Sequence, residues 1–185
     1  MTDTPVNDLT ITIWNANGLA KHTINTATNS LSNSILIFIT ETWLLSPNRY
    51  PTEWTQYHTY GLPVENSYRK SMGICLLIHP DCPYTVTILP TNSPSLLTCQ
   101  VADIPIHCVY LPPNINNNST DRTDVLGILF NLPLNTHSSQ SKTIICGDIN
   151  TRHPSLGDTR FNTRGTEIFN WMMDNGIECL NAILA

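Results

Sequence analysis

One stretch of the sequence limits the possible folds more than any other. Residues 34–40 form an almost continuous aliphatic run, which is typical of a β-strand buried on both faces. Residues 9–14 alternate apolar residues with threonine, which is the pattern of a strand with one buried face. Five further segments have strand patterns and are separated by turn residues: 72–79, 84–89, 96–101, 104–110 and 143–146. The sequence therefore predicts a sheet that other elements cover on both sides.

Helix patterns are fewer than strand patterns. Residues 22–33 are rich in threonine and asparagine, and residues 121–132 carry an apolar face. Residues 163–175 carry a stripe of isoleucine, phenylalanine and methionine; Asn162 or Thr163 can cap this helix, and the glycine that follows can close it.

Residues 44–71 contain several aromatic residues but no regular pattern, and we expect them to be irregular. The chain is thus predicted to be α+β, with more strands than helices, built as a sandwich of sheets flanked by helices.

The composition narrows the class of protein. The chain has 185 residues, a net charge of −5 and only 12% charged residues, which suits one domain and argues against binding nucleic acid through bulk charge. A local basic patch or an acidic metal site stays compatible with these values. No signal-peptide pattern is present, and the longest apolar run, 35–39, is too short to cross a membrane. No cysteines form a C-x-x-C pair, so we expect buried thiols in a reducing compartment. The protein is expected to be intracellular, nuclear or cytoplasmic, and not secreted.

Polar side chains follow four of the predicted strands. Asn15 and Asn17 follow the first, Glu41 the second, Tyr110 the sixth, and the pair at positions 148 and 150 the last. In a strand, residues i and i+2 share a face, so Asn15 and Asn17 should point together, as should Asp148 and Asn150. Carboxylate and amide oxygens suit a hard cation. Each signal alone is also typical of a turn or a helix cap, and only the ordered set is informative.

This ordered set resembles the endonuclease/exonuclease/phosphatase superfamily. The motifs are 14–19 (WNANGL), 41–44 (ETWL), 72–74 (MGI), 110–113 (YLPP) and 147–150 (GDIN). Residues 147–154 and 162–165 are similar in particular to the apurinic-type endonuclease domain of non-LTR (LINE-type) retrotransposons. The resemblance covers residues 9–181 and implies a four-layer α/β/β/α sandwich that hydrolyses phosphodiesters with Mg²⁺, or Mn²⁺ as a substitute. For that subgroup it implies DNA as the substrate, and a reverse transcriptase in the parent element.

The resemblance also implies roles for matching residues, of which the catalytic ones are Asn15, Glu41, Tyr110, Asp148 and Asn150. Glu41 matches a metal-binding glutamate, and Asn15 matches an asparagine that supports the metal and phosphate site. Asn17 stands where many relatives have aspartate, and we expect it to be a weaker metal ligand.

Three of these residues are implied to act on the phosphate and the water. Tyr110 matches a tyrosine that contacts the scissile phosphate. Asp148 matches the aspartate that orients or deprotonates the attacking water, and Asn150 matches its partner in the transition state. These residue types suit phosphodiester hydrolysis, because the anionic phosphate must be neutralised before a water can attack it.

Relatives carry further strands with a Ser-Asp-His motif after the region that this chain matches. That motif is absent from the sequence. We therefore expect residues 9–185 to be a domain that is incomplete at its C-terminus and lacks its last strands, with residues 1–8 as a short N-terminal extension.

Four basic or imidazole side chains are predicted to contact nucleic acid: Arg152, His153, Arg160 and Arg164. Two alternatives to a DNA-nicking enzyme stay open. One is a catalytically inactive remnant that only binds a partner, and the other is a phosphoesterase acting on a small molecule.

Overall fold

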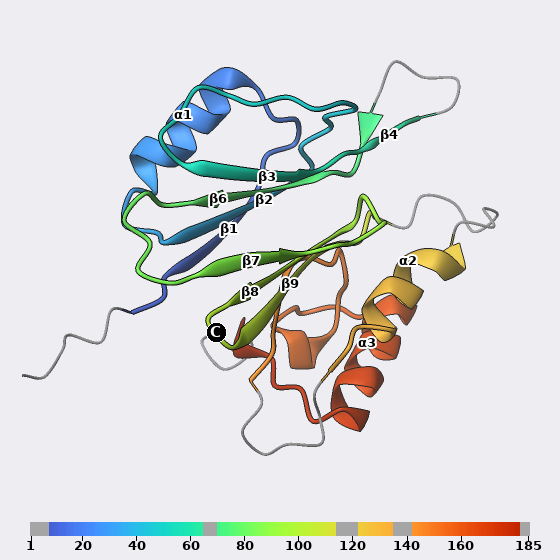
Figure 1. Cartoon of the computed structure of the whole chain (residues 1–185). Helices are drawn as coiled ribbons and strands as arrows, with labels where there is room; N and C mark the ends of the chain where they lie inside the picture. Colours follow the sequence, from blue (N-terminus) through green and yellow to red (C-terminus); the bar gives the residue numbers. More distant parts are fainter. Residues whose placement is uncertain (1–7, 65–69, 114–121, 135–141, 182–185) are drawn as a thin grey trace, which may run out of the picture. The chain divides into compact units, whose positions relative to one another are not determined.

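The computed structural model describes residues 8–64, 70–113, 122–134 and 142–181. The chain divides into two compact units, which are treated separately below. The first comprises residues 1–110 and 143–148, and the second comprises residues 111–142 and 149–185. Figure 1 shows the elements of both units.

The first unit contains a four-stranded sheet in the order β1-β2-β6-β3. Its strands are β1 (Ile11–Asn15), β2 (Leu36–Thr40), β6 (Ile74–Ile78) and β3 (Thr55–Thr59). β1 and β2 are parallel and are joined by α1 (Lys21–Ser30), whereas β6 is antiparallel to both of its neighbours. Asn15 lies opposite Thr40, so the two parallel strands end at the same edge and Glu41 follows directly.

A second four-stranded sheet of the same unit has the order β10-β9-β8-β7. Its strands are β10 (Ile144–Asp148), β9 (Ile104–Tyr110), β8 (Leu96–Val101) and β7 (Val86–Leu89). β10 and β9 are parallel, and the other two pairs are antiparallel. Asp148 lies opposite Tyr110, so this parallel pair also ends in two polar side chains. Two short strands, β4 (Leu62–Pro63) and β5 (Lys70–Ser71), form a separate ladder.

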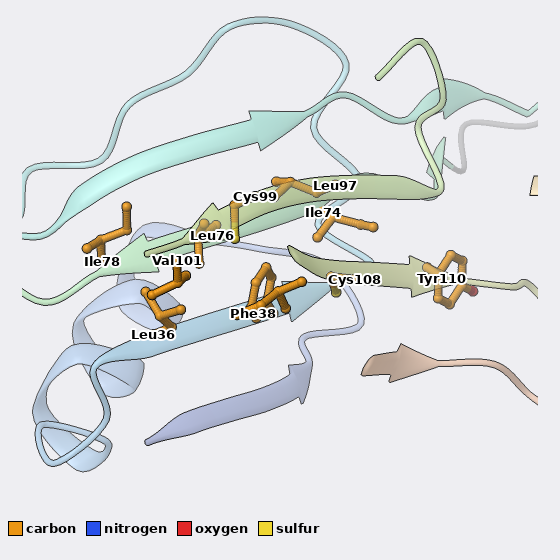
Figure 2. Close-up of a cluster of buried hydrophobic side chains, with 11 residues drawn as sticks. Leu36, Phe38, Ile74, Leu76, Ile78, Leu97, Cys99, Val101, Cys108 and Tyr110 are labelled. Carbon is orange, nitrogen blue, oxygen red and sulfur yellow. The ribbon is translucent and has the colours of Figure 1, made fainter. Parts of the chain in front are cut away.

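The core of the first unit lies between the two sheets. Alternate residues of β2 and β6 meet residues of β8 and β9 there, including Phe38, Leu76 and Cys108, all fully buried (Figure 2). The opposite face of β2 is also buried, because Ile37 packs with Ile24 of α1. The aliphatic run at residues 34–40 is therefore a strand covered on both faces, as its pattern predicts.

The second unit contains two helices and a short 3-10 helix. These are α2 (Arg122–Phe130), η1 (Pro154–Leu156) and α3 (Thr163–Asp174). Asn162 caps α3, because its side chain accepts a hydrogen bond from the amide of Gly165 at 2.7 Å. Gly176 has a φ of 63° just past the end of the helix, the left-handed conformation that glycine adopts easily.

The predicted strands and helices are all present, with ends shifted by up to three residues. The predicted α+β class is confirmed. Residues 1–7 of the predicted N-terminal extension lie outside the described residues. None of the helices in the described part combines the length and apolar character that a membrane span requires.

The prediction that residues 44–71 are irregular is wrong, because β3 lies among them. The buried side chain of this strand is a polar one, Gln56. Its amide oxygen and nitrogen are both hydrogen-bonded to the backbone of Tyr50 (3.2 and 2.6 Å). A buried glutamine breaks the alternation of apolar and polar residues by which strands are recognised.

All six cysteines are free thiols. Cys75, Cys99 and Cys108 are buried, as expected, and the other three are half-buried. Burial raises the pKa of the Cys99 thiol to about 12. The Cys99 thiol is therefore uncharged at neutral pH and acts as a small apolar side chain.

Candidate active site

Four polar side chains at the strand ends of the first unit form one hydrogen-bonded network. The Nδ2 group of Asn15 donates to Glu41 Oε1 at 3.0 Å and to Asp148 Oδ2 at 2.8 Å. The hydroxyl of Tyr110 donates to the same Glu41 oxygen at 2.8 Å. The network thus joins two residues of the first sheet's edge to two of the second sheet, although Asn15 and Asp148 lie 133 positions apart in sequence.

The amide of Asn15 has a defined orientation. Its oxygen accepts a hydrogen bond from the backbone N–H of Asn17 at 3.0 Å. Its NH₂ group is therefore directed at the two carboxylates, and its two hydrogens satisfy one oxygen of each. A neutral donor between Glu41 and Asp148 reduces the repulsion between them without neutralising their charge.

The backbone conformation of Glu41 is unusual. Its φ is 54°, a left-handed conformation that is uncommon for residues other than glycine, asparagine and aspartate. Neighbouring loops hold it there, since its carbonyl accepts from Gly18 N (2.8 Å) and the next amide, of Thr42, donates to Gly73 O (3.1 Å). A Cβ on Gly18 would lie 2.8 Å from the ring of Trp43, so only glycine allows this approach. Backbone strain of this kind is often kept where a side chain must be held in place for function.

Tyr110 combines an apolar position with a polar contact. Its ring belongs to the core between the sheets and is 4% exposed, so the hydroxyl can reach Glu41 from a fixed direction. Burial, followed by the hydrogen bond and the negative charge of Glu41, raises the pKa of Tyr110 well above its ordinary value of 10.0. The hydroxyl therefore stays protonated and remains a hydrogen-bond donor at all physiological pH values.

Asp148 is the last residue of β10, and the residue before it determines how closely the strand approaches β9. Gly147 has a φ of 127°, and a Cβ there would lie 1.9 Å from the carbonyl oxygen of Val109. A glycine is thus required beside Asp148 for the two strands to pair.

The predicted shared faces at the strand ends are wrong. Asn17 and Asn150 both have left-handed backbones, with φ of 47° and 43°, so the strand rule for residues i and i+2 does not apply. Asn17 contributes its backbone amide to Asn15, and its side chain is exposed. Asn150 belongs to the second unit, where its Nδ2 group donates to Leu111 O at 3.0 Å.

The donors in the network fit a hard divalent cation. Mg²⁺ is usually held by one or two carboxylates with waters completing its shell, and Glu41 and Asp148 supply two carboxylates about one amide. Among the described residues, no cluster of three or more histidine, cysteine, aspartate or glutamate side chains is arranged to hold a metal, so a site rich in protein ligands is not found there. The residues fit Mg²⁺ or Mn²⁺ better than zinc, which prefers nitrogen and sulfur ligands.

The residues predicted to contact nucleic acid fall into two groups. Arg152 and Arg160 are exposed. Arg164 is buried, and its guanidinium donates to Pro112 O at 2.7 Å. His153 stacks on Phe169 with ring centroids 4.5 Å apart, and its Nδ1 accepts from Ser155 N, so it holds the loop together.

Sequence patterns did not reveal the residues that support the network. Gly18, Trp43 and Gly147 hold the strand ends through close contacts across the chain, as described above. The sequence does show a glycine next to two of the motifs, because Gly18 follows Asn17 and Gly147 precedes Asp148.

Comparisons with known proteins agree with this architecture. Residues 104–184 match a family model described as endonuclease-reverse transcriptase. The endonuclease domain of TRAS1, a telomere-specific non-LTR retrotransposon, is similar over 90% of this chain and 71% of that one, with 11% identity and a TM-score of 0.60. An AP endonuclease from Archaeoglobus fulgidus covers 90% of this chain and 70% of its own, with 16% identity and a TM-score of 0.61.

A third similar structure is the 3′ phosphatase NExo from Neisseria bound to a product DNA hairpin. It covers 91% of this chain and 71% of its own, with 13% identity and a TM-score of 0.65. No curated protein matches the sequence. These similar structures confirm the fold that the resemblance implies, and the family match over residues 104–184 agrees with the resemblance itself. The matched family and the similar structures are nucleases or phosphatases by description, which is the class of enzyme that the resemblance implies.

Proposed function

We propose that the chain is a metal-dependent phosphodiesterase domain that nicks DNA. The observation that carries this proposal is the network of Asn15, Glu41, Tyr110 and Asp148. The two carboxylates offer oxygens to a cation, and the neutral donors can bind phosphate oxygens. A cation held by these carboxylates, with donors that can turn from them to phosphate oxygens once a substrate binds, suits an anionic ester better than a neutral substrate.

Glu41 is the proposed metal ligand, supported by Asn15 and with Asn17 as a weaker ligand. Glu41 Oε1 receives both hydrogen bonds, whereas its other oxygen accepts none among the described residues and is available for a cation. When bound, Mg²⁺ or Mn²⁺ would neutralise the phosphate oxygens and polarise the phosphorus.

Asp148 is the proposed base. A carboxylate at this position can accept a hydrogen bond from the attacking water, hold it in line with the scissile bond, and take its proton as the new P–O bond forms. Tyr110 and Asn150, which donate to Glu41 and to Leu111 O in this structure, are the proposed donors to the phosphate oxygens once the substrate is bound. The raised pKa of Tyr110 keeps its proton in place for this role.

We also propose that the substrate is DNA and that the chain originates from a retrotransposon. The matched family description and the TRAS1 domain support both, and the NExo complex shows the fold on DNA in another protein. A reverse transcriptase in the parent element and a nuclear or cytoplasmic location belong to the same proposal.

The test is nicking of supercoiled plasmid DNA in Mg²⁺, with EDTA as the metal-free control. We expect nicking that requires Mg²⁺ and is lost in Asp148→Ala. The matched control is Asp103→Asn, which changes an exposed aspartate in the turn between β8 and β9.

Protein that is folded by circular dichroism but does not nick DNA would contradict the proposal and favour the inactive remnant. Hydrolysis of a small phosphodiester without nicking would favour the small-molecule phosphoesterase.

A further inference from the structure

The described residues include one aromatic side chain that the fold leaves in solvent. Phe161 is 77% exposed, more than any other large apolar side chain in the described part of the chain. Other aromatic rings of the second unit make ring contacts, namely Phe130 with Trp171 and His153 with Phe169. Leaving a phenylalanine ring in solvent forgoes the free energy of burying it, so a use for the ring at the surface is expected.

The exposure of Phe161 does not result from a loose loop. Residues 152–162 are closed at their base, because Asn162 N donates to Arg152 O at 2.9 Å and the Asn162 side chain caps α3 by accepting from the amide of Gly165. A Cβ on Gly165 would lie 2.1 Å from Arg152 O, so the helix packs directly against the loop. Within the loop, the His153 carbonyl accepts from two later amides. The backbone that carries Phe161 is therefore held by hydrogen bonds, at the point where the loop closes.

Two exposed arginines lie near Phe161 along the backbone. Arg160 precedes Phe161 and is exposed, and the closing bond places the backbone of Arg152, also exposed, beside the next residue. The nearest acidic group in the loop, Asp158, accepts from the backbone amide of Arg160 at 2.9 Å. Glu167 of α3 is exposed and offsets part of the charge. In a chain with a net charge of −5, two exposed arginines beside an exposed ring form a distinct surface.

We propose that loop 152–162 binds an unpaired nucleotide of DNA, with one base stacked on Phe161 and the flanking phosphates on Arg152 and Arg160. A phenylalanine face stacks on any base, and arginines bind phosphate without regard to sequence, so the surface favours unpaired over paired strands but not one base over another. The choice of DNA rests on the proposed function, whereas the choice of an unpaired base rests on Phe161.

The test measures binding without hydrolysis. The probe is a short fluorescein-labelled oligothymidylate in EDTA and low salt, followed by fluorescence anisotropy, with a duplex of the same length for comparison. We expect Phe161→Ala to weaken single-strand binding about fivefold or more and to affect the duplex less. Phe161→Trp should keep the affinity. Met173→Ala, which removes another exposed apolar side chain of the same unit, should leave it unchanged.

Several results would overturn the proposal: no binding of the oligonucleotide by folded wild-type protein, equal affinities for wild type and Phe161→Ala, or a Phe161→Ala variant whose only change is lost self-association in sedimentation. The last result would make the ring an interface between copies of the chain.

Asp148→Ala separates this proposal from the proposed function. If that variant binds the oligonucleotide normally and the wild type does not nick plasmid, hydrolysis is refuted and the binding surface stands. If the wild type nicks plasmid and Phe161→Ala binds normally, the surface is refuted and hydrolysis stands.

Discussion

The two sheets of the first unit each end in a parallel pair of strands, and each pair carries two side chains of the network. In the first sheet, Asn15 ends β1, and Glu41 follows β2 on a left-handed backbone. In the second sheet, Tyr110 and Asp148 are the last residues of β9 and β10 and lie opposite each other in the ladder. Asn15 and Tyr110 then link the two edges through Glu41 and Asp148.

This difference indicates how each half of the network is held. Glu41 depends on a strained turn that neighbouring loops hold by backbone hydrogen bonds. Tyr110 and Asp148 depend on the register of two strands, which Gly147 makes possible. One half is therefore sensitive to turn geometry, and the other to strand pairing.

The largest expected effect comes from neutralising the carboxylate that each sheet contributes. Both Glu41→Gln and Asp148→Asn should lower plasmid nicking by about 100- to 10,000-fold. Glu41→Gln should also abolish the rise in melting temperature that Mn²⁺ produces, and Asp148→Asn should reduce it less, because a bound ligand stabilises the folded state and Glu41 is the proposed principal ligand. Differential scanning fluorimetry measures this rise. Glu53→Gln, at an exposed glutamate of the same unit, is the control. Equal loss of the Mn²⁺ effect in both variants would remove the distinction between the two sheets.

A smaller effect is expected from the glycine beside Asp148. Gly147→Ala adds a Cβ that meets the backbone of Val109 on a left-handed residue, so the free energy of unfolding should fall by about 2–4 kcal/mol. Urea denaturation followed by circular dichroism measures it. Gly127→Ala in α2 is the matched control, because its Cβ has room and alanine favours a helix, so stability should stay the same or rise. A Gly147→Ala protein as stable as the wild type would show that strand pairing does not require the glycine.

Removing the Tyr110 hydroxyl should affect activity more than stability. Tyr110→Phe keeps the ring in the core but removes the donor to Glu41, so nicking should fall on the order of 100-fold, whereas unfolding should change by about 1 kcal/mol. Tyr84→Phe is the matched control at another tyrosine of the same unit. An unchanged rate for Tyr110→Phe would contradict the role proposed for the second sheet's tyrosine.

The smallest effect concerns pH. Burial, and to a lesser degree Arg49, lowers the pKa of His58 on β3 to about 4 from an ordinary 6.5. The unfolded chain therefore binds a proton there that the folded chain excludes, so stability is fully present above pH 6.5 and is lost as the pH falls toward 4. The melting temperature should drop over this range, and less steeply in His58→Gln. The pKa of His107 on β9 is also lowered by burial, so some of the drop should remain. Identical slopes for His58→Gln and wild type would contradict the assignment.

Much of the candidate site followed from the sequence, because strand patterns show where strands end and polar residues follow those ends. Asn15, Glu41, Tyr110 and Asp148 were predicted in this way, and the structure brings them together. Their roles remain proposals.

Other features were not visible in the sequence because they depend on contacts between distant residues. The burial of Arg164 follows from its bond to Pro112, and β3 is recognisable only by its pairing with β6 and by the partner of Gln56. The left-handed backbone of Glu41 is held by neighbouring loops rather than by local preference, since this conformation is uncommon for glutamate.

The hydrogen bond between Asn15 and Asp148 has a consequence for the order in which the chain folds. β1 and β2 are close in sequence and can pair early. β10 can pair with β9 only after the segment between these two strands has folded back to bring them together. Contacts between residues so far apart form slowly, because the loop between them must first close. Forms of the protein without β10 in place keep Glu41 and Tyr110 but lack the carboxylate of Asp148. The complete set of polar groups is therefore expected to form only once β10 has paired with β9, and partly folded molecules would lack the proposed active site.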